Sequence, residues 1–283
     1  MSTSPAPRLA RRINELVFLA FCWTATAVAL LFLAAILWSL LSQGIGGLDL
    51  DIFTKSTPAP GSVGGLLNAI VGSLMMCVVA MVGAVLVGVL AGTWLSEYAR
   101  DSHYGKVVRF LNDVLLSAPS ILVGLFVYEV LVAPVKGFSG LAGSVALGLL
   151  AAPVITRTTE DVLRLQPTAL REASVALGAP VWRTILAVIW KSARGGMLTG
   201  ALLAFARISG ETAPLLFTAL NNQFLSFDLT KPTANLPVVI FNFALSAYDD
   251  WRRLAWAGAL LIAATVLTVT VVARILAREP RRS

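Results

Sequence analysis

The stretch ARISGETAPLLF, residues 206–217, places an arginine and a glutamate in a segment that is otherwise apolar. Between residues 195 and 220, Arg207 and Glu211 are the only ionisable side chains. Placing either charge at the centre of a bilayer costs about 2.5–3.5 kcal/mol on insertion scales. On a predicted helix the two share one face, but an intrahelical pair contributes only about 0.2–0.5 kcal/mol. The two charges therefore need another reason to be there.

An anion path is one such reason. A guanidinium matches phosphate oxygens in bidentate geometry and stays charged at every physiological pH, so Arg207 is the first candidate for an anion contact. Glu211 is predicted to hold Arg207 while the path is empty. The alternative is a salt bridge between helices that only fixes their packing.

Arg157 is a second candidate for the anion path, at the cytoplasmic end of a predicted span. Its neighbours include hydroxyl groups that could bind phosphate oxygens, from Thr156, Thr158 and Thr159. The alternative is that Arg157 is an anchoring charge at the membrane surface. Arg164 and Arg171, farther along, are interpreted as ordinary cytoplasmic charges.

Composition assigns the chain to the polytopic membrane proteins. Of its 283 residues 57% are hydrophobic and 13% charged, with a mean hydropathy of +0.82. Soluble domains are nearer a quarter charged. The positive charges do not gather on a polar domain, which argues against a nucleic-acid partner. Cys22, Cys77 and the single His103 give no disulfide framework and no metal-ligand spacing.

Six segments are long and apolar enough to be membrane-spanning helices. They cover residues 16–41, 66–93, 108–132, 139–156, 195–220 and 254–276. The first is too long for a signal peptide core and is interpreted as a retained helix. Short tails, residues 1–15 and 277–283, flank the spans. The apolar piece 236–245 is too short to span and is predicted as a short helix or strand at the outer surface.

Basic residues set the predicted orientation. Sixteen of the 22 lysines and arginines fall on the side that holds both tails and the long connection 157–194. The positive-inside rule therefore places that side in the cytoplasm. Two glycine pairs, Gly88 with Gly92 and Gly196 with Gly200, have the spacing that lets helix backbones approach closely. They are interpreted as packing positions.

The connection at 157–194, called the coupling segment below, predicts two short helices joined by a turn. Residues 171–177 favour a helix, Gly178 is a helix stop, and Pro180 suits the first turn of the next helix. On periodicity alone the segment is also compatible with a plain amphipathic connector.

The coupling segment resembles a known motif. Glu172-Ala173-Ser174, followed after three residues by Gly178-Ala179, is similar to the EAA loop of ABC-importer permeases. The family pattern continues with a Leu-Pro pair, where this chain has Trp190-Lys191. Further segments, between about residues 64 and 273, resemble the PstA-type permeases of phosphate ABC importers. These segments are RTTEDVLRLQ (157–166), residues 170–178, ARISGETAPLLFTALNN (206–222) and ANLPVVIFNF (234–243).

The resemblance implies an all-α, type I ABC importer permease fold over residues 66–276, in the cytoplasmic (inner) membrane. It implies docking of a cytoplasmic ATPase on Glu172, Ala173, Ser174, Gly178 and Ala179. The implied partners are a homologous second permease, two ATPase copies that bind ATP and magnesium, and an extracytoplasmic phosphate-binding protein. The chain has no GxxxxGK[ST] loop, so it is expected to be no enzyme and to bind no cofactor.

Three other functions remain open from the residues. A guanidinium does not distinguish tetrahedral oxyanions, so sulfate or molybdate is an alternative cargo. An ion-gradient-driven carrier is another class, but the sequence shows no convincing internal repeat. A non-transporting membrane regulator is the third.

Overall fold

The computed structural model describes residues 6–277, and that part of the chain is helical with no β-strand. Helix α1 (Ala6–Gly47) already includes most of the predicted amino-terminal tail. The predicted tail at 277–283, with three of the basic residues used to set the orientation, lies outside the described residues except for Ala277.

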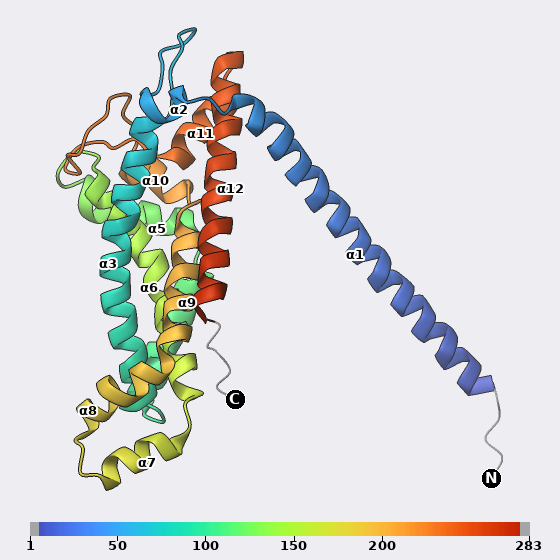
Figure 1. Ribbon diagram of the computed structural model, residues 1–283, viewed down its shortest axis with the longest axis vertical. Helices are drawn as coiled ribbons and strands as arrows, with labels where there is room; N and C mark the ends of the chain where they lie inside the picture. Colours follow the sequence, from blue (N-terminus) through green and yellow to red (C-terminus); the bar gives the residue numbers. More distant parts are fainter. Residues whose placement is uncertain (1–5, 278–283) are drawn as a thin grey trace.

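Four helices are long and apolar enough to cross a membrane. They are α1, α3 (Leu67–Glu97), α6 (Gly140–Arg164) and α12 (Asp249–Ala277). Helices α1 and α12 contain the spans predicted at 16–41 and 254–276, and α3 and α6 begin one residue after the starts of the spans predicted at 66–93 and 139–156 and extend beyond their ends. Helices α3, α6 and α12 belong to one bundle, whereas α1 leans away from the bundle at a wide angle (Figure 1). The other two predicted spans are interrupted.

The predicted span at 108–132 is a bent pair. Helix α4 (His103–Ser117) and helix α5 (Ser120–Val127) meet at an angle of 102°. Pro119 separates them, and the residue before it, Ala118, is extended rather than helical. Proline disfavours a helical conformation at the residue before it, which explains the break. A wide π-helical turn, η1 (Tyr128–Val132), continues α5.

The predicted span at 195–220 is divided into α9 (Trp190–Ile208) and α10 (Ala213–Thr218). Pro214 lies in the first turn of α10. In a continuous helix its ring would collide with the carbonyl of Gly210, so the helix ends and restarts. Helix α9 packs against both α6 and α12. It has only 19 residues and three cations, Lys191, Arg194 and Arg207, so it lacks the long, nearly uncharged stretch of the four continuous spans.

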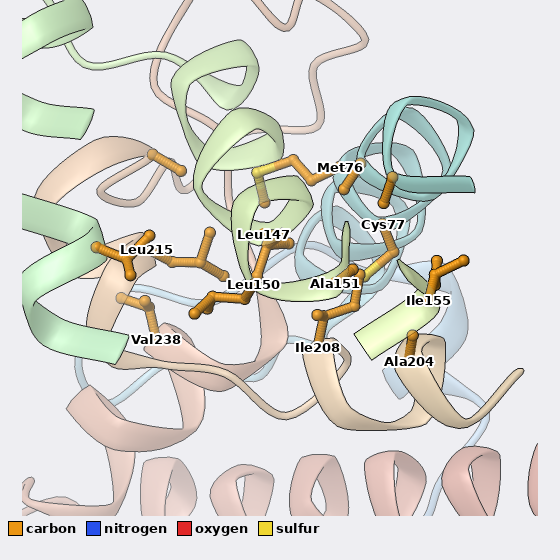
Figure 2. Close-up of a cluster of buried hydrophobic side chains, with 14 residues drawn as sticks. Met76, Cys77, Leu147, Leu150, Ala151, Ile155, Ala204, Ile208, Leu215 and Val238 are labelled. Atoms are coloured by element: carbon orange, nitrogen blue, oxygen red, sulfur yellow. The ribbon is translucent and has the colours of Figure 1, made fainter. Parts of the chain in front are cut away.

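The main hydrophobic core lies where α3, α6, α9 and α10 meet (Figure 2). Met76 and Cys77 enter it from α3, and Ile208 enters from the end of α9. Figure 2 shows Leu147 and Leu150 of α6 among the side chains of the cluster. Helix α6 is therefore the central element of the bundle.

Both predicted glycine pairs pack against α6. A Cβ at Gly88 would lie 2.7 Å from Ile155 Cβ, and one at Gly92 would lie 2.6 Å from the Thr156 carbonyl oxygen. On α9, Gly196 faces Val162 and Gly200 faces Thr158 in the same way. The prediction that these positions serve close helix packing is confirmed.

The two ends of the bundle carry different elements (Figure 1). At one end lie α2 (Asp51–Thr54), α10 and α11 (Leu236–Ala244). At the other lie α7 (Thr168–Ala176) and α8 (Val181–Thr184). Helix α11 confirms the short helix predicted at 236–245, and it lies at the end of the bundle opposite the coupling segment (Figure 1). Its residues Val239 and Phe243 are buried in a second core with Leu254 of α12.

We expect Gly92→Ala to lower the thermal unfolding midpoint of the purified chain, because the new methyl group collides with the α6 backbone. Overpacking of this kind costs about 1–3 kcal/mol. Gly83→Ala, on the same helix with no atom within 4 Å of its added Cβ, is the matched control. It should be neutral or slightly stabilising. Unfolding of both variants at the same temperature would contradict the packing role.

Candidate functional site

The first residues of the coupling segment, 157–164, still belong to α6, and its last, 190–194, to α9; the part between them projects from the bundle (Figure 1). Pro167 precedes α7 and Pro180 precedes α8. A wide π-helical turn, η2 (Ile185–Ile189), joins α8 to α9. The two predicted short helices and the turn between them are confirmed.

Gly178 makes the turn between α7 and α8. Its φ of +78° lies in the left-handed region, which glycine adopts without a steric penalty. The Gly178 amide donates to the Val175 carbonyl, and the Ala179 amide donates to the Ser174 carbonyl at 3.2 Å. These bonds satisfy carbonyl groups at the end of α7 and complete a helix stop.

A buried hydrogen bond of Ser174 joins α7 to α8. Its hydroxyl lies 2.8 Å from the hydroxyl of Thr184, and both residues are buried. Among the predicted ATPase-docking residues, Ser174 therefore faces the interior of the coupling segment. Glu172 and Ala173 are exposed on α7 instead.

The outer face of the coupling segment is apolar and exposed. Its large exposed side chains are Val175, Leu177, Val181, Trp182 and Leu186. Leu177, beside the turn, is 87% exposed. Several large exposed apolar side chains in one short segment are typical of a protein-contact site.

Arg171 ties α7 to the ends of two core helices. Its Nε and Nη2 donate to the two carboxylate oxygens of Glu97, at 2.9 and 2.6 Å. Its Nη1 and Nη2 donate to the carbonyls of Gln166 and Leu163. The hydrogen bond with Glu97 raises the pKa of Arg171, which keeps the guanidinium charged. The interpretation of Arg171 as an ordinary cytoplasmic charge is therefore wrong.

A second charged group lies on α6 beside the first. The Glu160 carboxylate is 3% exposed; it accepts a hydrogen bond from Arg109 at 2.6 Å and forms an ion pair with Arg164 at 2.8 Å. Arg109, on α4, also donates to the carbonyls of Leu95 and Ala99 at the end of α3. Arg164 is thus another structural charge that was interpreted as ordinary. We call these five residues the basal cluster: Glu97, Arg109, Glu160, Arg164 and Arg171.

Arg157 lies on the exposed side of α6 between two carboxylates. Asp161 is 3.2 Å from its Nε, and Asp113 of α4 is 3.7 Å from its Nη1. The predicted help from neighbouring threonines is wrong for two of them, because Thr156 and Thr158 donate their hydroxyls to carbonyls of their own helix. The Thr159 hydroxyl is buried against α3.

Arg207 lies in the last turn of α9 and is exposed. Glu211 follows the end of the helix, in the turn before α10, and is half-buried. The two residues therefore do not share a helix face, which corrects the sequence-based expectation. Within residues 6–277, no ion pair joins Arg207 to Glu211 or to another carboxylate. The guanidinium is open to a ligand or to a neighbouring subunit.

A family model described as the binding-protein-dependent transport system inner membrane component matches residues 84–282. This range holds the second half of α3, all of α4 to α12, the coupling segment and the five residues of the basal cluster. The chain belongs to this family. It is therefore a multi-pass membrane component of a binding-protein-dependent transport system.

Relatives within the binding-protein-dependent family are similar over nearly the whole chain. The phosphate transport system permease protein PstA of Pasteurella multocida is 52% identical, over 94% of this chain and 95% of that protein. The protein of the same name from Haemophilus influenzae is 49% identical, over 94% of each chain.

The family fold is also found in a solved transporter. A chain of the inward-facing MetNI methionine ABC transporter superposes with a TM-score of 0.64 at 20% identity. The match covers 75% of this chain and 94% of that one. This likeness supports the predicted type I importer permease fold.

The basal cluster is the part of the site that sequence reasoning missed. One signal was present, since Glu160 and Arg164 are four positions apart and so share a face of α6. The pairing of Arg171 with Glu97 joins residues 74 positions apart. It depends on how the end of α3 meets the coupling segment, which local spacing does not encode.

We expect Glu160→Gln to destabilise the chain strongly, because Arg109 and Arg164 would lose their common buried counter-charge. Removing one partner of a buried ion pair typically costs about 3–5 kcal/mol. The neighbouring Asp161→Asn is the control, since its exposed pair with Arg157 contributes only about 0–1 kcal/mol. Thermal unfolding in detergent measures both, and equal midpoints would show that the buried pair adds nothing to stability.

Proposed function

We propose that the chain is the membrane-spanning permease subunit of an ATP-driven importer of inorganic phosphate. The observation that carries this proposal is the 52% identity to a phosphate transport system permease over 94% of the chain. The specific features of the site, an exposed arginine and an apolar docking face, fit that function.

The coupling segment is the proposed attachment point for the energy source. Glu172 and Ala173 are exposed there, next to the apolar face around Leu177 and Trp182. The Gly178–Ala179 turn gives this face its shape. We propose that one of two copies of an ABC ATPase docks on it, and that ATP and magnesium bind to those subunits. The permease itself then catalyses no reaction.

The orientation follows from charge and topology. The end of the bundle with the coupling segment also carries Arg100, Lys106 and Arg109, and α1 begins and α12 ends toward that end (Figure 1). The positive-inside rule supports a cytoplasmic location for this end and for both termini. The opposite end, with α2 and α11, would face the extracytoplasmic phosphate-binding protein. Lipid and a homologous second permease would cover the exposed apolar faces of the spans.

Arg207 is the proposed phosphate contact. Its guanidinium is exposed at the break between α9 and α10, and a bidentate contact with phosphate oxygens would neutralise it. Glu211, in the turn that follows, would limit the affinity by repelling the bound anion, so that phosphate is released. Arg157 is the proposed second contact, and Asp113 and Asp161 would compete with phosphate for its guanidinium.

One uptake experiment distinguishes phosphate from sulfate or molybdate as the cargo, and ATP from an ion gradient as the energy source. The permease is reconstituted in vesicles with its partner permease, ATPase and binding protein, and entry of radiolabelled phosphate is measured. We expect uptake only with hydrolysable ATP, and little competition from an excess of sulfate or molybdate. Strong competition would identify a different cargo, and uptake driven by an ion gradient without ATP would identify a carrier. No phosphate uptake either with or without ATP would favour a non-transporting membrane regulator.

We expect Arg207→Lys to keep the positive charge and still lose most phosphate uptake, because an ammonium group cannot make the bidentate contact. Losing one charge-assisted hydrogen bond costs about 1.5–3 kcal/mol, or roughly ten- to hundredfold in rate. Arg194→Lys, at another exposed arginine of α9, is the matched control. Wild-type uptake by the Arg207→Lys complex would remove the geometric argument for this residue.

A further inference from the structure

The basal cluster joins four elements at one point. Arg171 belongs to α7, Glu97 to the last residue of α3, Arg109 to α4, and Glu160 and Arg164 to α6. It lies at the end of the bundle from which the coupling segment projects (Figure 1). Any displacement of α7 relative to the bundle must therefore strain or break bonds in this cluster.

Arg171 is held in one orientation. Its four hydrogen bonds, all between 2.6 and 2.9 Å, go to the Glu97 carboxylate and to the carbonyls of Leu163 and Gln166. A bidentate guanidinium–carboxylate pair fixes direction as well as distance. The Glu97 side chain is 8% exposed and that of Arg171 is 22% exposed, so water competes little for these bonds. An anchoring charge at a membrane surface would need none of this geometry.

The remaining attachments of α7 are few. Most of its side chains are exposed, and Ser174 points to Thr184 of the coupling segment rather than to the bundle. Leu170 packs against a small core that contains Leu163 of α6 together with Ile189 and Ala193. This contact leads to the end of α6 and the start of α9. The path from α7 to α3 goes through Arg171 and Glu97.

We infer that Arg171 and Glu97 are positioning residues that transmit movement of the coupling segment to α3. The inference rests on the proposed function, because it takes the ATPase to dock on the coupling segment. When the docked ATPase pushes α7, the Arg171–Glu97 pair carries the displacement to α3. The contacts of Glu160 with Arg109 and Arg164 carry it on to α4 and α6. Without the pair, α7 pivots between Pro167 and Gly178 and the push is lost.

The decisive measurement is the amount of ATP hydrolysed per phosphate imported by the reconstituted complex. We compare wild type with Arg171→Gln, Glu97→Gln and Arg171→Lys. Both glutamine variants should raise the ratio about fivefold or more, within the range of ordinary coupling energies. The lysine variant, which keeps the charge but not the bidentate geometry, should be intermediate. The ratio does not depend on how much complex assembles, so partial misassembly leaves the test valid.

Lys106→Gln is the control, because this exposed cation of α4 lies at the same end of the molecule. It should leave the ratio at the wild-type value. Glutamine variants that lose uptake and ATP hydrolysis in equal proportion would overturn the inference, since they would show only a structural role.

A second measurement is independent of phosphate and of the ATPase. Spin labels at Ala176 on α7 and Leu90 on α3, both exposed, report their separation in the purified full-length chain with its two cysteines replaced. Arg171→Gln should broaden the distance distribution, and Lys106→Gln should not. An unchanged distribution would overturn the inference. Wild-type complex that imports no phosphate would refute the proposed function alone, and the label distances would still decide whether Arg171 positions α7.

Discussion

The close approach of two helices to α6 is the contact on which the rest of the bundle depends. In a membrane no hydrophobic force pulls helices together, so they associate through close packing of small residues and through hydrogen bonds. Gly88 and Gly92 bring α3 onto one side of α6, and Gly196 and Gly200 bring α9 onto another. The main core fills the space between these three helices and α10. Helix α6 is therefore the reference against which the charged and functional residues are placed.

The polar groups of the molecule are arranged around this packed centre. Glu160 and Arg164 lie in the last turns of the same helix, where two arginines surround one buried carboxylate. A buried ion group of this kind is costly to break even when it adds little net stability. Its main role is then to fix the positions of α3, α4 and α6 relative to one another. Arg157, on the exposed side of α6, is left with weaker and longer contacts.

Sequence reasoning predicted the elements that composition and local chemistry determine. The four continuous spans, the glycine contacts and the helix–turn–helix form of the coupling segment all follow from apolar length, small residues and the Gly178 and Pro180 signals. The breaks at Pro119 and Pro214 were also visible in the sequence, but the apolar runs around them were interpreted as continuous helices. Arg207 and Glu211 were placed on one helix face for that reason.

The spacing of residues along the sequence could not predict ion pairs between residues that lie far apart in the chain. Arg171 and Arg164 looked like surface charges because their carboxylates are supplied by other helices or lie on a buried face. The threonines beside Arg157 show the opposite error. Their hydroxyls looked available for a ligand, yet Thr156 and Thr158 donate to their own helix backbone.

The position of α1 has a consequence for how the chain is made. Residues 11–38 are exposed along the whole of the diverging helix, and its carboxyl end is held by α12. There Gly44 lies against Leu260, and the Gly46 carbonyl accepts from Arg253, 207 positions later in the chain. Within residues 6–277, α1 is therefore secured to the bundle through α12, which follows every other described helix in the chain. A chain whose synthesis stops before α12 keeps α1 without this anchor, so α1 reaches its final position only after the rest of the bundle has been made.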